Sequence, residues 1–348
     1  MKTLLDIKQL TFAYAQQPLL QNINLTIDAG QVGCLLGPSG CGKSTLLRLI
    51  AGFEQPQSGT VMIDHLQVTG DHHMLPPQQR QVGMLFQDLA LFPHLTVQQN
   101  IAFGLQHLPQ EQRRQRTAEL IQLCRLQKLN TRHPHHLSGG QCQRVALARA
   151  MAPKPKLILL DEPFSSVDRG LQSEMAQEVK SMLQADGSTA LWVTHSLEEA
   201  FAVADQMGVM LNGQLLQWGT PVELHDQPAS PDVIRFLNQA NLINGQLNPE
   251  SRLDTVLGTF DLCNADQFMP GDILQIGLSK HLLQVSTPTE GSKAIINKCI
   301  YQGGHHVLTA TLTNGDQVQL FHHQSIPVGQ SIQLKVSNPQ PVLGFAIS

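Results

Sequence analysis

The feature that most constrains this chain is a glycine-rich run that directly follows the apolar residues 32–36. The pattern G-x-x-x-x-G-K-[ST] is met by Gly37, Pro38, Ser39, Gly40, Cys41, Gly42, Lys43, Ser44 and Thr45. It predicts a buried strand that ends near residue 36 and a helix that begins near Lys43. The backbone N–H groups of such a loop and the positive end of its helix attract a phosphate chain. We therefore expect a nucleoside triphosphate, with Lys43 reaching its β- and γ-phosphates and Ser44 offering a hydroxyl to Mg²⁺.

The length and charge of the chain bound its architecture and its partners. At 348 residues it is too long for one compact core, so we expect two domains. Its apolar content of 41% and charged content of 14% are typical of a globular protein. The net charge is only -4, and the densest basic stretch, residues 113–116, is interleaved with Glu111 and Glu119. This pattern favours a solvated helix face over a nucleic-acid-binding surface, so we expect no nucleic-acid partner.

Three features that the sequence lacks favour a location inside the cell. No apolar stretch approaches the ~20 residues that span a bilayer, and Asp6 comes too early for a secretory signal. The six cysteines show no C-x-x-C spacing, which favours reduced thiols. The histidine pairs at 72–73, 135–136, 305–306 and 322–323 lack other ligands at zinc-like spacing, which favours solvated loops over a metal site. We expect any role at a membrane to come through a partner.

Short apolar runs predict the strands of the first part of the chain. Residues 4–7 and 23–27 alternate like antiparallel strands. Residues 157–160 and 190–194 are continuously apolar, as in a parallel sheet whose faces are covered by helices. The stretch 93–150 has helical periodicity. Its apolar stripe, which we interpret as core packing, is formed by Leu120, Ile121, Leu123, Cys124 and Leu126.

The character of the sequence changes after residue 238. The segments 272–276, 307–312 and 317–321 are short and have alternating or β-branched residues. Asn314-Gly315, between the last two segments, is typical of a two-residue hairpin turn. The last part of the chain is therefore predicted to be a small all-β domain.

A second motif is compatible with phosphate binding. Leu137-Ser138-Gly139-Gly140-Gln141 places a serine at a helix N-cap position, ahead of the good helix-forming residues 141–151. Its two glycines let a phosphate approach the backbone, and the helix dipole favours that negative charge. On its own the motif fits an ordinary helix cap equally well. The phosphate loop earlier in the chain favours the functional interpretation.

With both motifs present, the chain resembles the ATP-binding-cassette family, and residues 137–141 are similar to the signature sequence of that family. The resemblance implies an α/β fold. Its P-loop core would have a mixed sheet with RecA-like and helical subdomains, the helical one at about 93–150. This core would occupy residues 1–238. Residues 239–348 would form a small all-β, OB/TOBE-like barrel for regulation and dimerisation.

The resemblance also implies a homodimer with ATP at its interface. Two cassettes pair head to tail in this family, so the signature of one copy closes over the γ-phosphate that the other copy holds. The residues acting in trans would be Ser138, Gly139, Gly140 and Gln141, together with Asp168, which is similar to the D-loop aspartate. Each dimer would then contain two composite sites.

Other elements of the family occur in the expected order and imply catalytic roles. Asp161 resembles the Walker B residue that binds Mg²⁺, and Glu162 resembles the residue that polarises the attacking water. Gln87 is similar to the glutamine that senses Mg²⁺ and this water, and His195 to the histidine that contacts the γ-phosphate. With Lys43, these residues would carry phosphoryl transfer to water.

Two other comparisons with the family pattern are less specific. Tyr14 resembles the aromatic residue that stacks on adenine, with Phe12 as the other candidate and core packing as the alternative. Many relatives carry an Arg-Pro-Glu run in the β domain where this chain has Leu278-Ser279-Lys280-His281. A regulatory contact made by that run would therefore not carry over to this chain.

The sequence favours one use of a cassette over two others. It has no long coiled-coil insertion, unlike DNA-repair cassettes, and only one ATPase half, unlike translation-factor cassettes. The resemblance implies the peripheral energy subunit of an importer, on the cytoplasmic face of the inner membrane. Its partners would be two permease subunits or one fused permease, docked in part on residues 87–97. A periplasmic or extracellular substrate-binding protein would deliver the cargo.

The cargo is predicted from one stretch only. Residues 81–97 are most similar to the ferric-iron branch, so Fe³⁺ is the predicted cargo. Sugars, polyamines, sulfate and molybdate are alternatives within the same subunit role. A regulatory cassette that binds ATP without driving transport is an alternative of a different class.

Overall fold

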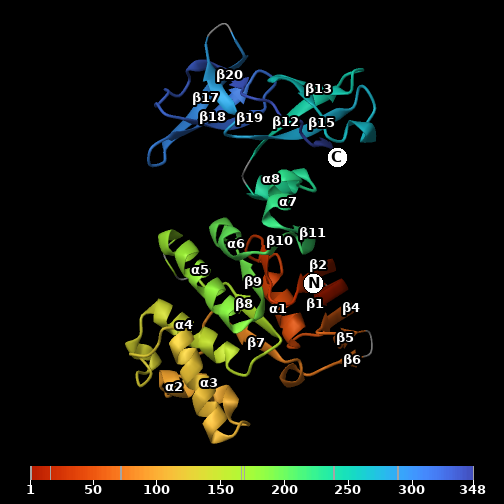
Figure 1. Cartoon of the computed structure of the whole chain (residues 1–348). Helices are drawn as coiled ribbons and strands as arrows, with labels where there is room; N and C mark the ends of the chain where they lie inside the picture. Colours follow the sequence, from red (N-terminus) through yellow and green to blue (C-terminus); the bar gives the residue numbers. More distant parts are fainter. Residues whose placement is uncertain are drawn as a thin grey trace. The chain divides into compact units, whose positions relative to one another are not determined.

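The computed structural model describes residues 2–15, 17–70, 73–165, 167, 169–237, 240–287 and 290–347. These residues form two compact units, 1–224 and 225–348, each with its own hydrophobic core (Figure 1). Within the described ranges, no helix is long and apolar enough to cross a membrane.

A six-stranded sheet in the order β11-β10-β3-β9-β8-β7 forms the centre of the first unit. Its strands are β3 (Val32–Leu36), β7 (Val82–Leu85), β8 (Leu157–Asp161), β9 (Thr189–Thr194), β10 (Gln206–Leu211) and β11 (Gln214–Gly219). All neighbours pair in parallel except β11, which runs antiparallel to β10. Every residue of β3, β8 and β9 is buried, and the continuously apolar strands predicted there are confirmed.

An antiparallel sheet in the order β2-β1-β4-β5-β6 completes the strands of this unit. Its strands are β1 (Thr3–Tyr14), β2 (Gln17–Asp28), β4 (Ser58–Ile63), β5 (Leu66–Gly70) and β6 (His73–Met74). β1 and β2 are much longer than the predicted segments 4–7 and 23–27. Shifts of register, which are typical of β-bulges, let their pairing continue where the sequence stops alternating.

Helices connect the strands of the first unit. They are α1 (Lys43–Ala51), α2 (Val97–Ala102), α3 (Gln110–Leu123), α4 (Gly139–Met151), α5 (Arg169–Asp186) and α6 (Leu197–Val203), and α7 (Pro221–Asp226) follows at the junction of the two units. α2, α3 and α4 lie between β7 and β8 in the chain, within the stretch where helical periodicity predicts helices. Leu120, Cys124 and Leu126 are fully buried there, as their interpretation as core residues requires.

A buried arginine holds the last turn of α1. This residue, Arg80, is only 1% exposed. Its guanidinium donates to the carbonyl oxygens of Leu49, Ile50 and Leu75 at 2.8, 2.9 and 2.7 Å. The first two carbonyls belong to the end of α1, where helical partners run out. Gly52 has a φ of 89°, and a Cβ there would lie 2.4 Å from Nε of Arg80, so only glycine fits. Burial lowers the pKa of Arg80 to about 10, which leaves it charged at neutral pH.

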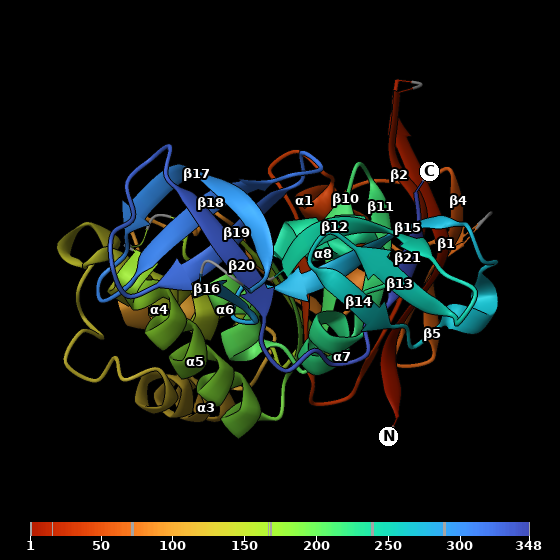
Figure 2. The same ribbon diagram turned by 90° about the horizontal axis from the view of Figure 1, so that it is seen from above.

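Two five-stranded antiparallel sheets build the second unit, in the orders β14-β13-β12-β15-β21 and β16-β20-β17-β18-β19 (Figure 2). The strands are β12 (Ala240–Leu247), β13 (Arg252–Thr255), β14 (Gly258–Asp261), β15 (Ile273–Ser279), β16 (Leu283–Ser286), β17 (Ser292–Tyr301), β18 (His306–Leu312), β19 (Gln317–His322), β20 (Ser331–Val336) and β21 (Gly344–Ala346). The inner faces of both sheets contribute to one core, for example through Ile276, Leu308 and Leu334. The all-β character predicted for this part of the chain is confirmed.

The turn between β18 and β19 differs from the predicted two-residue hairpin. Gly315 N donates to Leu312 O at 3.0 Å, and Leu312 N donates to Asp316 O at 2.8 Å, so the turn is longer. A two-residue turn of the Asn-Gly type needs a positive φ at both residues. Here Gly315 has a φ of 91°, whereas Asn314 is not in that region and instead accepts from the Asp316 amide at 3.1 Å. The side chain of Asn314 thus stabilises a different turn.

The helix α8 (Pro231–Leu237) belongs to the second unit. It packs on β12 and β15 through Val233, Ile234 and Leu237, which are buried. Gly277 on β15 permits this approach, because a Cβ there would lie 2.8 Å from Cδ1 of Ile234. The compact unit therefore begins before the boundary predicted between 238 and 239, two positions that lie outside the described residues.

We expect Arg80→Ala to destabilise the first unit by about 3 kcal/mol. The substitution removes the guanidinium that donates to the carbonyl oxygens of Leu49, Ile50 and Leu75. Urea unfolding followed by tryptophan fluorescence measures this unit alone, since both tryptophans, Trp192 and Trp218, lie in it. The matched control is Arg114→Ala on the exposed surface of α3. An equal effect of the two substitutions would contradict the role of Arg80.

Candidate functional site

The predicted site residues gather where the parallel strands of the central sheet end. β9 lies between β3 and β8, with Thr194 paired to Leu36 and Val193 paired to Asp161. Neighbouring parallel strands present their carboxyl ends at one edge of the sheet. The segments that follow β3, β8 and β9 therefore leave the sheet side by side, although they lie far apart in the sequence.

The predicted phosphate loop follows β3. Residues 37–42 form the loop, and residues 43–45 form the first turn of α1, as predicted. Gly40 and Gly42 have φ values of 85° and 104°, which glycine adopts without strain. Lys43 is 4% exposed, and its Nζ donates to the carbonyl oxygens of Gly37 and Pro38 at 2.8 and 3.0 Å. The loop thus curves around the ammonium group of its own lysine.

Two oxygen ligands of the kind that Mg²⁺ prefers meet beside this loop. Ser44 Oγ donates to Asp161 Oδ1 at 2.7 Å, and this links the start of α1 to the end of β8. Burial raises the pKa of Asp161, and the hydrogen bond from Ser44 opposes that shift. A hydroxyl and a carboxylate suit Mg²⁺, which usually takes few protein ligands and keeps water or phosphate oxygens. No cluster of three or more His, Cys, Asp or Glu that could hold a metal occurs within the described ranges.

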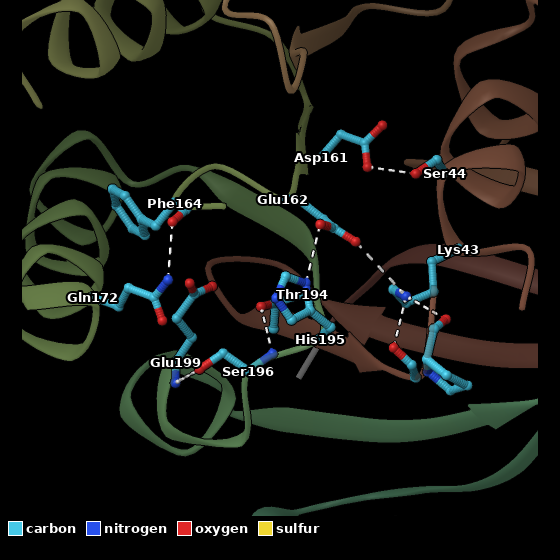
Figure 3. A network of polar contacts seen from close by, with 12 residues as sticks. Lys43, Ser44, Asp161, Glu162, Phe164, Gln172, Thr194, His195, Ser196 and Glu199 are labelled. Atoms are coloured by element: carbon cyan, nitrogen blue, oxygen red, sulfur yellow. Dashed lines mark hydrogen bonds and ion pairs between the residues drawn. The ribbon is translucent and has the colours of Figure 1, made fainter. Parts of the chain in front are cut away.

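Glu162 lies at the centre of the polar network (Figure 3). Its Oε2 is 3.1 Å from His195 Nδ1, and its Oε1 is 3.9 Å from Lys43 Nζ. A φ of 42° turns the chain sharply at Glu162, and its amide donates to Val193 O at 3.1 Å. The carboxylate is therefore held between an ammonium group and an imidazole that come from two neighbouring strands.

Buried polar groups support the turn that carries His195. Thr194 Oγ1 accepts from the Ser196 amide at 3.0 Å, and Ser196 Oγ accepts from the Glu199 amide at 3.3 Å, capping α6. Glu199 is 2% exposed, and its Oε2 accepts from Trp192 Nε1 at 3.3 Å. Burial raises the pKa of Glu199. Sequence reasoning missed Glu199, although S-x-x-E is the pattern of a helix start.

Two buried glutamines fix the loop that follows β8. Gln143 on α4 donates to the carbonyl oxygen of Pro163 at 2.7 Å. Gln172 on α5 donates to the carbonyl oxygens of Phe164 and Val167 at 3.0 and 3.1 Å. Both side chains are at least 94% buried. The sequence gives no signal for them, because they are two of many glutamines and only the packed fold shows which are buried.

The signature motif forms the start of α4. Ser138 is the N-cap and forms a capping box with Gln141. The Gln141 backbone amide donates to Ser138 Oγ at 3.4 Å, and the Ser138 backbone amide donates to Gln141 Oε1 at 3.0 Å. The predicted helix and cap are confirmed. Ser138 and Gly139 are exposed, and neither takes part in the described hydrogen bonds and ion pairs of Glu162. The described chain thus leaves the signature residues outside the network of the phosphate loop.

Gln87 and Tyr14 stand apart from this network. Gln87 follows β7 and is exposed, and no described hydrogen bond links it to the other site residues. Tyr14 is 45% exposed and donates to Glu54 Oε1 at 3.1 Å, whereas Phe12 is 4% exposed and belongs to the core. Core packing is therefore the role of Phe12 and not of Tyr14. Asp168 lies outside the described residues.

A cation near the end of α4 fixes the loop after β7. Arg149 donates to the carbonyl oxygens of Leu89 and Ala90 at 3.0 and 2.6 Å. Both residues have positive φ values, 60° and 44°, so the arginine stabilises a backbone conformation that leucine and alanine rarely adopt. Its guanidinium carbon also lies 5.4 Å from the ring centroid of Phe92. The helix that begins at the signature motif is thereby joined to the loop predicted to receive a permease.

The arrangement meets the demands of phosphoryl transfer in three parts. Backbone N–H groups and Lys43 are donors for a chain of phosphates. Ser44 and Asp161 supply a hydroxyl and a carboxylate 2.7 Å apart, which are groups of the kind that bind a divalent cation. Glu162 is a carboxylate between Lys43 and His195, in a position from which it could accept a hydrogen bond from water.

Sequence comparisons agree with this chemistry. The family model described as ABC transporter matches residues 20–165. The chain is 44% identical over 256 residues to the putrescine transport ATP-binding protein PotG of Escherichia coli (strain K12), covering 73% of this chain and 67% of that protein. It is 37% identical over 341 residues to the spermidine/putrescine import ATP-binding protein PotA of Nitratidesulfovibrio vulgaris, covering 93% of this chain and 92% of the relative. It is 34% identical over 333 residues to the Fe(3+) ions import ATP-binding protein FbpC of Fusobacterium nucleatum, covering 93% and 88%.

Solved structures are similar in fold as well as in sequence. The post-hydrolysis dimer of the ATP-binding cassette MJ0796 bound to ADP and Pi aligns with a TM-score of 0.54 and 31% identity, covering 62% of this chain and 98% of that one. CbiO1 from Clostridium perfringens, part of the ABC transporter complex cbiONQ, aligns with a TM-score of 0.60 and 30% identity, covering 68% and 95%. The predicted family and fold class are confirmed: the chain belongs to the ATP-binding subunits of ABC importers.

Proposed function

We propose that this chain binds ATP with Mg²⁺ and hydrolyses it as the energy-coupling subunit of an importer. The observation that carries the proposal is the position of Glu162, 3.1 Å from His195 Nδ1 and 3.9 Å from Nζ of Lys43, the lysine of the phosphate loop. A carboxylate in this place can accept a hydrogen bond from water that attacks a γ-phosphate.

The contacts of Lys43 suggest how nucleotide binding prepares this carboxylate. The ammonium group contacts two loop carbonyls and Glu162 in the described structure. Phosphate oxygens carry more negative charge than carbonyl oxygens and attract the ammonium more strongly. Binding of ATP would therefore weaken the pair between Lys43 and Glu162 and leave the carboxylate to orient water, with His195 holding its other oxygen.

Ser44 and Asp161 are the residues that would hold Mg²⁺, with Gln87 contributing from the end of β7. When bound, the ion would offset the negative charge that develops on the transferred phosphate. The chain itself supplies the hydroxyl and the carboxylate at 2.7 Å from each other, which is close enough for both to face one cation. Tyr14, exposed near the start of the chain, is proposed to stack on the adenine ring.

The signature residues support a site that is shared between two copies. Ser138 and Gly139 are exposed and stand outside the network of their own phosphate loop. They also have the groups that bind phosphate, which are a capped helix start and glycine backbone. The similarity to the MJ0796 dimer bound to ADP and Pi supports a homodimer in which Ser138, Gly139, Gly140, Gln141 and Asp168 act in trans.

The partners and location follow from the importer role. We propose that the chain sits on the cytoplasmic face of the inner membrane beneath two permease subunits or one fused permease. The loop held by Arg149 is proposed to contact the permease, because its link to α4 connects it mechanically to the signature motif. A periplasmic or extracellular binding protein would supply the cargo.

Two cargoes compete. The sequence of residues 81–97 favours ferric iron, and a relative of 34% identity is named as an Fe(3+) importer subunit. Relatives of 44% and 37% identity are named for putrescine and spermidine/putrescine, so iron is not confirmed and a polyamine is a second candidate of at least equal standing.

Replacing Glu162 by Gln tests the catalytic role. We expect ATP binding to stay within about threefold of wild type and turnover to fall by about 10²-fold or more, because the amide is a poor acceptor for the water proton. Phosphate release and nucleotide titration measure the two effects. The control is Glu198→Gln, an exposed carboxylate of α6. Turnover close to wild type in the Glu162 variant would remove this residue from its role.

Mixing two inactive variants tests whether the site is shared. Lys43→Ala lacks a working phosphate loop, and Gly139→Asp lacks a working signature. A mixed dimer with sites shared in trans contains one intact site, so random mixing should recover about a quarter of wild-type turnover. Sites made within single chains would give no recovery. Mixed dimers, counted by native mass spectrometry, that form without recovering any turnover would contradict the shared site.

Uptake assays in a strain that lacks this gene test the cargo. If iron is the cargo, ferric uptake should fall and return with the wild-type gene but not with the Glu162→Gln variant, while putrescine uptake is unchanged. The reverse pattern would assign a polyamine. Uptake of iron, polyamines, sugars and oxyanions that is unaffected by the deletion would favour the regulatory, non-transport alternative.

A further inference from the structure

One sheet of the second unit has two faces of different character. On β18 and β19, Leu308, Ala310, Val318 and Leu320 point into the core and are fully buried. Because side chains alternate along a strand, the residues between them lie on the opposite face of the sheet. That second face is not part of the core.

The opposite face carries two rows of paired residues across β17, β18 and β19, which lie side by side (Figure 2). One row is polar and pairs Lys298 with Thr309 and Thr309 with Gln319. The other row is apolar and consists of Ile300, Val307 and Phe321, paired in the same way. The sheet therefore presents a cationic, hydrogen-bonding strip directly beside an apolar strip.

The turn that follows β15 and this face of the sheet together line a cavity of about 490 Å³. Ser279 O accepts from the Leu282 amide at 3.1 Å, and Ser279 Oγ accepts from the His281 amide at 3.4 Å, which fixes the turn. His281 lies against Phe321, with 4.6 Å between ring centroids. Lys280, between these residues, also lines the cavity although it is only 8% exposed. The volume is in the range of sites for small ligands.

The charged side chains that line this cavity are lysines, and Asp226 lies just outside the lining, 2.6 Å from Nδ1 of the lining His225. The ionisable groups that line it are lysines and histidines, and its described lining contains no Asp or Glu. Burial lowers the pKa of Lys280, because the ammonium group loses hydration. An anion in the cavity would be attracted by Lys280 and Lys298, and Thr309, Gln319 and Ser279 could donate hydrogen bonds to it.

We propose that this cavity binds a small organic anion, with a carboxylate or phosphate group at Lys280 and Lys298 and a short apolar part against Ile300, Val307 and Phe321. The two adjacent strips match such an amphipathic anion in charge and in polarity. A cation such as a polyamine would meet two ammonium groups, and the described lining itself contains no Asp or Glu. The site lies wholly in residues 225–348 and does not depend on the proposed ATPase function.

Calorimetric titration of phenyl phosphate into the full chain tests the proposal. Excess MgADP is present to occupy the phosphate loop. We expect saturable binding of one phenyl phosphate per chain, and binding of inorganic phosphate that is about tenfold weaker because it lacks the apolar part. Phenol and spermidine should not bind. No saturable binding of phenyl phosphate, or displacement of phenyl phosphate by spermidine, would overturn the proposal.

Charge-removing substitutions locate the binding site. Lys298→Gln and Lys280→Gln should each weaken phenyl phosphate binding by about tenfold. Lys298 is exposed, so its variant tests the site even where the buried Lys280 variant is unstable. The matched control is Lys293→Gln, on the same strand and also exposed but about 16 Å away along β17. An equal loss in the Lys293 variant, or no loss in the Lys298 variant, would show that the anion binds elsewhere and overturn the proposal.

Discussion

The parallel pairing of β3, β9 and β8 is the constraint on which the rest of the structure depends. All residues of these strands are buried, so backbone hydrogen bonds and side-chain packing fix their order and register together. Because parallel strands end at one edge, the loops that follow them must converge. Glu162 comes within 4 Å of both Lys43 and His195 for this reason. The site is a consequence of strand order before it is a consequence of side-chain chemistry.

Convergence places the loops, but buried polar contacts hold their conformations. Arg80 binds the end of α1, Gln143 binds the loop after β8, and Arg149 binds the loop after β7. Each donates to backbone carbonyl groups at a helix end or in a loop, where few backbone donors are available. Since an unsatisfied buried carbonyl costs free energy, each loop is stable only in the conformation that the side chain satisfies. Gln143 and Arg149 both lie on α4, so a movement of this helix must also move the loops after β7 and β8.

The second unit places chemistry on a surface by a different principle. Its core uses one face of each sheet, and the alternation of side chains leaves the other face free to carry a second pattern. On β17, β18 and β19 that pattern is a polar row beside an apolar row, closed by the turn at Lys280. The phosphate loop binds anions with backbone N–H groups, whereas this cavity would use side chains. Changes of a few residues alter such a site without changing the fold.

Local sequence determined the parts of this protein whose chemistry is contained in a short segment. The phosphate loop, the capped start of α4, the buried strands β3, β8 and β9 and the all-β character of the second unit were all predicted, because their patterns depend on neighbours in the chain. Glu162 and His195 were assigned by resemblance, since an acid or a histidine after a strand has no distinctive pattern of its own. The Asn314-Gly315 turn shows the limit of local rules, because a hydrogen bond from Asn314 selected another turn. Only the tertiary structure decided that Glu162 lies between Lys43 and His195, that Arg80, Gln143 and Glu199 are buried supports, and that Lys280 and Lys298 line one cavity. These relations join residues that are distant in the chain, so they depend on strand order and register, which no single segment encodes.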